Sequence, residues 1–235
     1  MITFRHTEVI GWEHAIRGMR NPLESWEKSD SDCVNNFPLF DVVFEPRLGP
    51  NDLSLMMKLR KAGTDHRKFM RYIIVYVDIT APLYWWKEFE TYRAGVHPGQ
   101  EPINPMDIEM NSCSTMHKIH AKEFTLDDFS CEHLMDRLDG IYENYNRGPI
   151  WGFQETITML NMCRDLYLQT KDKKYWWQMI QLLPTSYNQK RTVMLNYEVL
   201  ANIYKSRKDH KLDEWHDFCD WIKGLPYSEL ITGEE

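Results

Sequence analysis

The sequence KFMRYIIVYVDIT at residues 68–80 runs directly into APLYWWKEFETYRAG at residues 81–95. The first stretch is rich in isoleucine, valine and tyrosine, and apolar side chains alternate in its second half, which is typical of a β-strand. In the second stretch, Pro82 falls in the first turn of a possible helix and Gly95 falls at its end. We therefore expect a strand over 68–80 followed by a helix over 81–95.

Helical patterns dominate the rest of the chain. NDLSLMMKLRKAG begins with Asn51 or Asp52 as a capping residue, continues with an apolar face and ends at Gly63. Further helices are expected over residues 114–124, 130–146, 151–170, 173–184, 192–210 and 212–225. Many helices and few strands predict a helix-rich α+β fold with a small sheet.

Two regions lack such patterns. Residues 1–50 contain several breaks before proline and little periodicity, so we expect an irregular segment with one short strand over 41–44. Residues 96–109, VHPGQEPINPMDIE, contain three prolines and predict a loop. No repeat divides the chain, and 235 residues are a usual size for one domain, so a single domain over 1–235 is expected.

Composition narrows the class of protein. The net charge of -7 argues against nonspecific binding to nucleic acid. No apolar run approaches the length of a membrane span, and the N-terminus is not typical of a signal peptide, so we expect a cytoplasmic protein that does not bind membranes. The five cysteines are odd in number and far apart, which suits free thiols in a reducing compartment.

The stretch MNSCSTMHKIH, which starts at Met110, gathers side chains that could bind a metal ion. On a helix, His117, His120 and Glu123 would lie on roughly one face, and zinc accepts imidazole and carboxylate ligands. Their spacing matches no established zinc pattern, and no distant ligand is marked. We therefore predict no metal site.

The same stretch could instead carry a nucleophile. Ser112, Cys113 and Ser114 stand near His117, but no strand–turn–helix elbow with glycines surrounds them. A polar helix start, capped by Asn111 or Ser112, accounts better for these residues.

The segment LPTSYNQKRTVMLNYEVLANIYKSRKDHKLDEW, residues 183–215, offers a third group. Asn196 and Asn202 would lie on different faces of a regular helix beginning near Thr192, and would converge only if several elements built one pocket. There, amides could meet the donors and acceptors of a flavin or pyrimidine edge, and the planar fork of Arg207 could hold a carbonyl or phosphate. A solvated helix face is the alternative. The chain contains no glycine-rich dinucleotide fingerprint.

Residues 183–215 resemble the C-terminal segment of the flavin-dependent thymidylate synthases. That family has Leu-Pro, then a helix with Asn, Leu, Asn and Arg at set spacing, then Asp, His and Trp. The matching residues here are Leu183, Pro184, Asn196, Leu200, Asn202, Arg207, Asp209, His210 and Trp215.

Residues 61–95 are similar to a second block of the same family. His66 falls on the family's flavin-contacting histidine, and TYR at 91–93 falls on the Arg-His-Arg that opens its signature motif. After the insert, Asn111 and Ser114 match the second half of that motif.

Several departures from the family concern the nucleotide phosphate. Met116 replaces an arginine that grips it, Ser112 replaces a glutamate of the motif, and Glu88 stands where a neutral glutamine is common. The arginine before Leu-Pro is also missing. Because each charge-assisted contact contributes roughly 1.5–3 kcal/mol, we expect weaker binding of dUMP. Basic residues that could compensate are Lys87, Lys118, Lys190 and Arg191.

The resemblance implies a specific enzyme: an α+β homotetramer with active sites at subunit junctions. FAD reduced by NADPH would supply a hydride, and methylene tetrahydrofolate a carbon, to C5 of dUMP. By position, the residues that would contact the flavin are His66, Tyr92, Arg93, Asn196 and Asn202. Those that would contact the nucleotide are Glu88, Asn111, Ser114 and Arg207, with Ser114 and Arg207 at the reacting ring. A flavoenzyme acting on another pyrimidine nucleotide, for example by hydroxymethylation, and a non-catalytic nucleotide-binding descendant are the alternatives.

Overall fold

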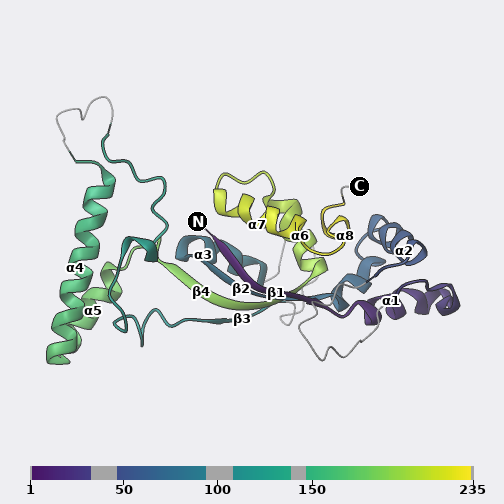
Figure 1. The fold of residues 1–235 in the computed structure, drawn as a ribbon, viewed down its shortest axis with the longest axis horizontal. Coiled ribbons are helices and arrows are strands. Elements are labelled where there is room, and N and C mark those ends of the chain that lie inside the picture. Colours follow the sequence, from purple (N-terminus) through teal and green to yellow (C-terminus); the bar gives the residue numbers. More distant parts are fainter. Residues whose placement is uncertain (1, 33–46, 94–107, 139–146, 234–235) are drawn as a thin grey trace. The chain divides into compact units, whose positions relative to one another are not determined.

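The computed structural model describes residues 2–32, 47–93, 108–138 and 147–233. It shows a helix-rich α+β fold with one small antiparallel sheet (Figure 1). The strands are β1 (Thr3–Ile10), β2 (Ile74–Pro82), β3 (Ile108–Ser112) and β4 (Asn188–Asn196), in the order β1-β2-β4-β3. The expected fold class is therefore confirmed.

Helices make up most of the remaining described residues. They are α1 (Trp12–Arg20), α2 (Pro50–Lys61), α3 (Leu83–Arg93), α4 (Pro149–Thr170), α5 (Lys173–Leu182), α6 (Tyr197–Arg207), α7 (Asp213–Lys223) and α8 (Glu229–Thr232). The expected helices over 51–63, 81–95, 151–170, 173–184 and 212–225 are confirmed as α2, α3, α4, α5 and α7, although Gly95 lies outside the described residues. None of the helices in the described ranges is long and apolar enough to cross a bilayer.

The chain divides into two compact units. The first comprises residues 1–3, 80–89 and 111–191, and the second comprises residues 4–79, 90–110 and 192–235. The expectation of a single domain stays a prediction. The flavin-side candidates and Arg207 belong to the second unit, whereas Glu88, Asn111 and Ser114 belong to the first.

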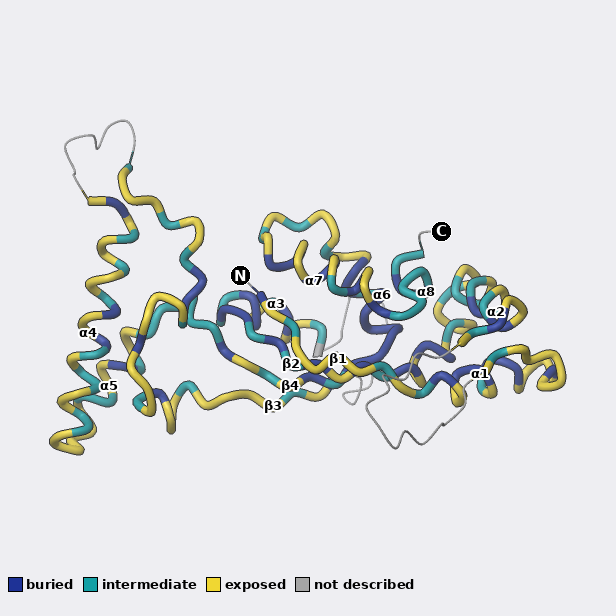
Figure 2. Tube along the Cα trace, viewed as in Figure 1, coloured by how far each residue is buried: buried dark blue, intermediate teal, exposed yellow. Residues whose placement is uncertain are grey.

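The first unit is organised by the helical hairpin of α4 and α5 (Figure 1). One face of the hairpin joins an apolar cluster whose buried members are Ile119, Phe124, Phe129, Ile157, Leu160 and Met179. The outer face of α4 is exposed (Figure 2) and includes Trp151, Met159, Met162 and Leu166.

The second unit is organised around α6, which packs against α7, α8 and the 3-10 helix Arg67–Tyr72. The side chains of Tyr197, Leu200 and Ile203 on α6 are completely buried. Because α6 is fixed on several sides, polar side chains at its ends and on its remaining face are held in defined positions.

The N-terminal residues are more regular than the sequence suggested. Within 1–50, where we expected an irregular segment, the chain forms β1 and α1. The turn between them needs Gly11, whose φ is 94° and where a Cβ would lie 1.9 Å from the carbonyl oxygen of Tyr72. β1 is exposed along most of its length (Figure 2), so it has little apolar alternation to detect. The expected strand over 41–44 lies outside the described residues.

The segment expected to be one helix over 192–210 is a strand followed by a helix. Val193 and Leu195 are buried on one face of β4, and the hydroxyl of Thr192 donates to the carboxylate of Asp78 at 2.7 Å. Pairing with β2 therefore overrides the local helical pattern. In β2, regular strand begins only at Ile74, because Arg67–Tyr72 form a 3-10 helix, and it ends at Pro82.

The two helices expected over 114–124 and 130–146 are wrong in the part that the structure describes. Residues 113–125 and 130–138 form turns, bends and irregular chain, and residues 139–146 lie outside the description. The amide of Asn161 on α4 accepts from the Phe124 N–H at 2.8 Å and donates to the Phe124 carbonyl at 2.9 Å. These bonds replace the ones that a helix would have made.

Two smaller expectations also concern this region. Residues 117–123 form no helix, so the single helical face expected for His117, His120 and Glu123 is wrong. No three His, Cys, Asp or Glu side chains in the described ranges are grouped to hold a metal ion.

Cys113, Cys131, Cys163 and Cys219 are free thiols, and burial raises the pKa of Cys219 to about 11. Of the loop expected over 96–109, residues 108–109 belong to β3 and the others are outside the description.

Candidate functional site

The junction between β4 and α6 places Asn196 at a helix start rather than inside a helix. Its side-chain oxygen accepts a hydrogen bond from the Val199 N–H at 3.0 Å, and only 3% of the residue is exposed. An asparagine in this position satisfies one of the amides that a helix start leaves without an intrahelical partner. Asn196 therefore caps the N-terminus of α6.

A buried carboxylate lies on the first turn of α6. Glu198 is paired with two arginines of the 3-10 helix Arg67–Tyr72. Arg67 Nε is 3.2 Å from one carboxylate oxygen, and Arg71 Nε donates to the other. The Glu198 side chain is only 8% exposed, so this carboxylate is buried together with its arginine partners.

Arg67 also reaches the next turn of α6. Arg67 Nη2 donates to the side-chain oxygen of Asn202 at 2.9 Å. Asn202 lies four residues after Glu198, on the same face of α6. Because the oxygen of Asn202 faces Arg67, its amide N–H group faces the other way and offers donors. His66, at the start of the 3-10 helix, is exposed next to this cluster in the chain.

Arg207, the last residue of α6, lies near the aromatic rings of Tyr92 and Trp215. Its Nε donates to the phenol oxygen of Tyr92, in the last turn of α3, at 2.7 Å. Its guanidinium carbon lies 4.7 Å from the ring centroid of Trp215 and 5.4 Å from that of Tyr92. Trp215, on α7, is completely buried and gives the guanidinium a rigid neighbour.

The candidate residues of the first unit are less enclosed. Glu88 is half-buried on α3, and Asn111 is exposed on β3. The Ser114 hydroxyl accepts from the N–H groups of Met116 and His117 at 3.2 and 2.9 Å. Ser114 therefore stabilises a turn, where a helix start capped by Asn111 or Ser112 was expected.

A cation lies near this turn. Arg191 stacks over Trp86 at 4.3 Å and its Nε donates to the Gln189 side-chain oxygen at 3.0 Å. The Gln189 amide in turn donates to the carbonyl of Cys113 at 2.6 Å. Of the four basic residues that could compensate for Met116, Arg191 is thus linked through one side chain to the 111–114 stretch.

The structure brings some candidates together and leaves others apart. Tyr92 contacts Arg207 directly, and Asn202 contacts Arg67. Sequence reasoning did not identify Arg67, Glu198 or Gln189. Arg93 ends α3, and its side chain lies outside the described part of the molecule. The roles of all these residues stay predictions.

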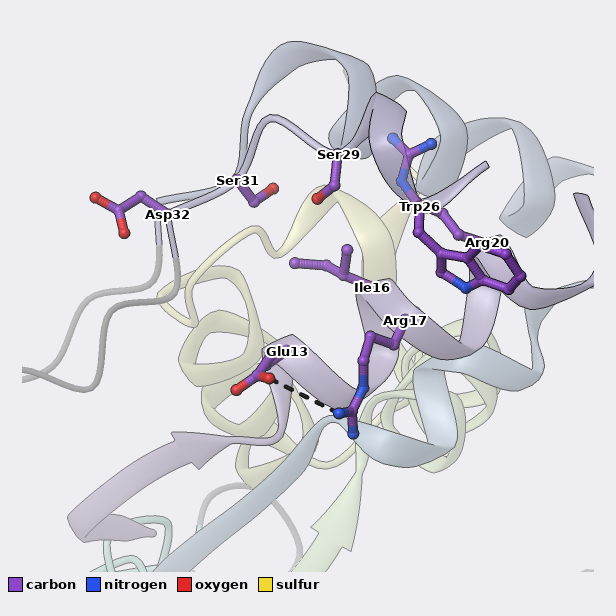
Figure 3. Close-up of a pocket in the computed structure, with 8 residues that line it drawn as sticks. All are labelled: Glu13, Ile16, Arg17, Arg20, Trp26, Ser29, Ser31 and Asp32. Atoms are coloured by element: carbon purple, nitrogen blue, oxygen red, sulfur yellow. Dashed lines mark ion pairs between the residues drawn. The ribbon is translucent and has the colours of Figure 1, made fainter. Parts of the chain in front are cut away.

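A cavity of about 330 Å³ lies elsewhere in the second unit, between α1 and the segment after it (Figure 3). Its lining residues are Glu13, Ile16, Arg17, Arg20, Trp26, Ser29, Ser31 and Asp32. The hydroxyls of Ser29 and Ser31 donate to Asp52, at 2.7 and 2.6 Å, and Arg20 Nε donates to it at 2.7 Å. Much of the polar wall is therefore committed to a structural network, and no candidate site residue lines the cavity.

Comparison with known proteins identifies the fold. No protein-family model matches the sequence, and no curated protein matches it. Flavin-dependent thymidylate synthase ThyX from Helicobacter pylori, complexed with FAD and dUMP, matches with a TM-score of 0.62 and 15% identity, over 99% of this chain and 98% of that chain. The UMP/dUMP methylase PolB from Streptomyces cacaoi, bound with 5-Br dUMP, matches with a TM-score of 0.57 and 13% identity, over 99% and 95%. This chain therefore has the fold of the flavin-dependent thymidylate synthases.

Proposed function

We propose that this protein is a divergent flavin-dependent thymidylate synthase-like enzyme that binds FAD and methylates dUMP at C5. Methylene tetrahydrofolate would supply the carbon and NADPH would reduce the flavin. We further propose a cytoplasmic homotetramer with shared active sites. The observation that carries the proposal is α6, along which Asn202 and Arg207 are each held by a partner side chain.

The residues on α6 and beside it fit a flavin. The ring edge of a flavin carries carbonyl oxygens and ring nitrogens that accept hydrogen bonds, and Asn202 offers N–H donors in a fixed orientation. Arg67 and Arg71 add positive charge, and His66 adds an exposed imidazole. We therefore assign Asn202 and His66 to the flavin, and assign Asn196 the role of capping α6. Arg93 is assigned to the flavin by its position in the family motif alone. When bound, the flavin would supply the hydride.

The remaining candidates are assigned to the nucleotide. Arg207 would donate N–H groups to a pyrimidine carbonyl, where positive charge stabilises a polarised ring. Asn111, Ser114 and Glu88 would lie beside the nucleotide, with the Ser114 hydroxyl oxygen holding its own turn. Arg191 would take over part of the phosphate binding that Met116 cannot provide.

Flavin content is the first test of the proposal. Purified protein is expected to show flavin absorbance, or to gain it on incubation with FAD, and to release tritium from 5-tritiated dUMP when NADPH and methylene tetrahydrofolate are supplied. Protein that stays colourless after incubation with FAD would reject a flavoenzyme. Flavin-loaded protein that releases no tritium would reject dUMP methylation only.

A second candidate substrate is another pyrimidine nucleotide. It is favoured by Met116, which is exposed where the family has an arginine, and by the half-buried carboxylate of Glu88. Tritium release from 5-tritiated UMP but not from dUMP would favour this alternative. A flavin-free protein that still binds dUMP would indicate the non-catalytic descendant.

Arg67 provides a sharper test of the flavin assignment. The Arg67→Ala variant is expected to bind FAD about tenfold more weakly, because Asn202 loses the bond that orients its amide. Binding is measured by titration of FAD into flavin-free protein, with thermal unfolding as a check of folding. Arg17→Ala is the matched control, since the Arg17 side chain is 61% exposed and its partner Glu13 is 3.9 Å away. An Arg67→Ala variant with the affinity of the parent would contradict the role of this cluster.

A further inference from the structure

Tyr92 occupies the position of the signature motif where the family has histidine. Its phenol contacts Arg207, whereas the sequence predicted a contact with the flavin. The hydrogen bond of 2.7 Å from Arg207 Nε ties the phenol to a guanidinium. The Tyr92 ring also packs edge-on against Trp215, with ring centroids 6.1 Å apart. Three helix segments, the end of α3, the end of α6 and the start of α7, thus meet at Arg207.

These contacts fix the plane of the guanidinium. An arginine near a helix end can adopt many rotamers, and ordering it on binding a ligand opposes affinity. A bond to Nε together with the Trp215 ring restricts both the position and the rotation of the fork. A guanidinium held in one orientation suits recognition of a planar acceptor.

We propose that Tyr92 is a positioning residue for nucleotide binding, acting through Arg207, and not a flavin contact. This inference rests on the proposed function, because it takes Arg207 as the group that meets the pyrimidine carbonyl. The phenol oxygen keeps Arg207 oriented before the nucleotide arrives. The ligand class is a nucleotide whose planar base presents a carbonyl oxygen to the Nη groups.

The test removes one oxygen atom. Tyr92→Phe keeps the ring against Trp215 and deletes only the acceptor for Nε. We expect the dissociation constant for dUMP, measured by calorimetry on the FAD-loaded protein, to rise about tenfold, as for loss of one hydrogen bond to a charged group. Affinity for FAD is expected to stay the same. Tyr76→Phe is the matched control, because Tyr76 is an exposed tyrosine on β2.

A double-mutant cycle separates positioning from a general effect on folding. If Tyr92 acts through Arg207, adding Tyr92→Phe to Arg207→Ala should change dUMP affinity no further. Equal effects of Tyr92→Phe in both backgrounds, loss of FAD in place of dUMP, or a Tyr92→Phe variant that binds dUMP like the parent would each overturn this inference alone. A parent protein that binds FAD but no pyrimidine nucleotide would overturn both the inference and the proposed function.

Discussion

Replacing Arg207 by alanine is expected to weaken dUMP binding by about a hundredfold while leaving FAD bound. A hydrogen bond from a charged donor contributes about 1.5–3 kcal/mol, and the guanidinium can make two such bonds to a planar acceptor. The loss should be larger than for Tyr92→Phe, because the charge itself is removed and not only its orientation. Calorimetric titration of dUMP into FAD-loaded protein gives the affinity.

Two variants serve as controls for Arg207→Ala. Lys208→Ala removes a neighbouring positive charge from an exposed position, and it should leave dUMP affinity within about twofold of the parent. Arg207→Lys keeps the charge but loses the planar fork and the Nε bond to Tyr92, so an intermediate affinity is expected. An Arg207→Ala variant that binds dUMP like the parent would remove the central residue of the proposed nucleotide site.

Replacing Asp52 by asparagine is expected to lower the free energy of unfolding by about 3–5 kcal/mol. The Asp52 side chain is completely buried, and its carboxylate accepts from Arg20, Ser29 and Ser31. Asparagine has nearly the same shape but no charge, so Arg20, which is 3% exposed, would be left without a counterion. Urea denaturation of both proteins measures the difference.

The pH dependence of stability should report the same carboxylate. Burial by itself raises the pKa of Asp52, but hydrogen bonds from Ser31, Ser29 and Arg20 outweigh burial and hold it below the ordinary value of 3.8. A folded-state pKa below the unfolded one means that the stabilisation is present above the unfolded value and is lost as pH falls through the folded one. The stability gap between parent and Asp52→Asn should therefore narrow in acid, below about pH 4.

Asp220→Asn is the matched control for Asp52→Asn. Asp220 is paired with Lys223 at 2.9 Å, but its side chain is 71% exposed. A surface pair of this kind contributes about 0–1 kcal/mol, so the variant should unfold close to the parent. Equal losses in the two variants would contradict a structural role for the buried Asp52 network.

The sequence predicted elements whose own side chains carry the pattern. α4 is long, and α7 has an apolar stripe made of Trp215, Phe218 and Ile222, so local periodicity suffices. β4 and α6 were merged because Thr192 to Asn196 are strand only through pairing with β2, more than a hundred residues earlier. β1 escaped detection because its side chains are mostly exposed on both faces.

The candidate site shows the same limit. Asn202 and Arg207 were identified from spacing within one segment that resembles a known family. Arg67 and Glu198 were missed because the reason for a buried carboxylate at this position is its pairing with Arg67, and 131 residues separate the two. Buried ion pairs between distant segments leave no periodic signal, so only the folded chain reveals which arginine meets which carboxylate.

The exposed strand β1 has a consequence for how the protein avoids aggregation. It is an edge strand of the sheet, and the unpaired backbone groups on the outer edge of such a strand can pair with a strand of another molecule. Charged side chains at Arg5 and Glu8, and a left-handed backbone at His6 with φ of 54°, make β1 a poor template. We therefore expect the homotetramer that we propose not to use intermolecular β-pairing along this border of the sheet.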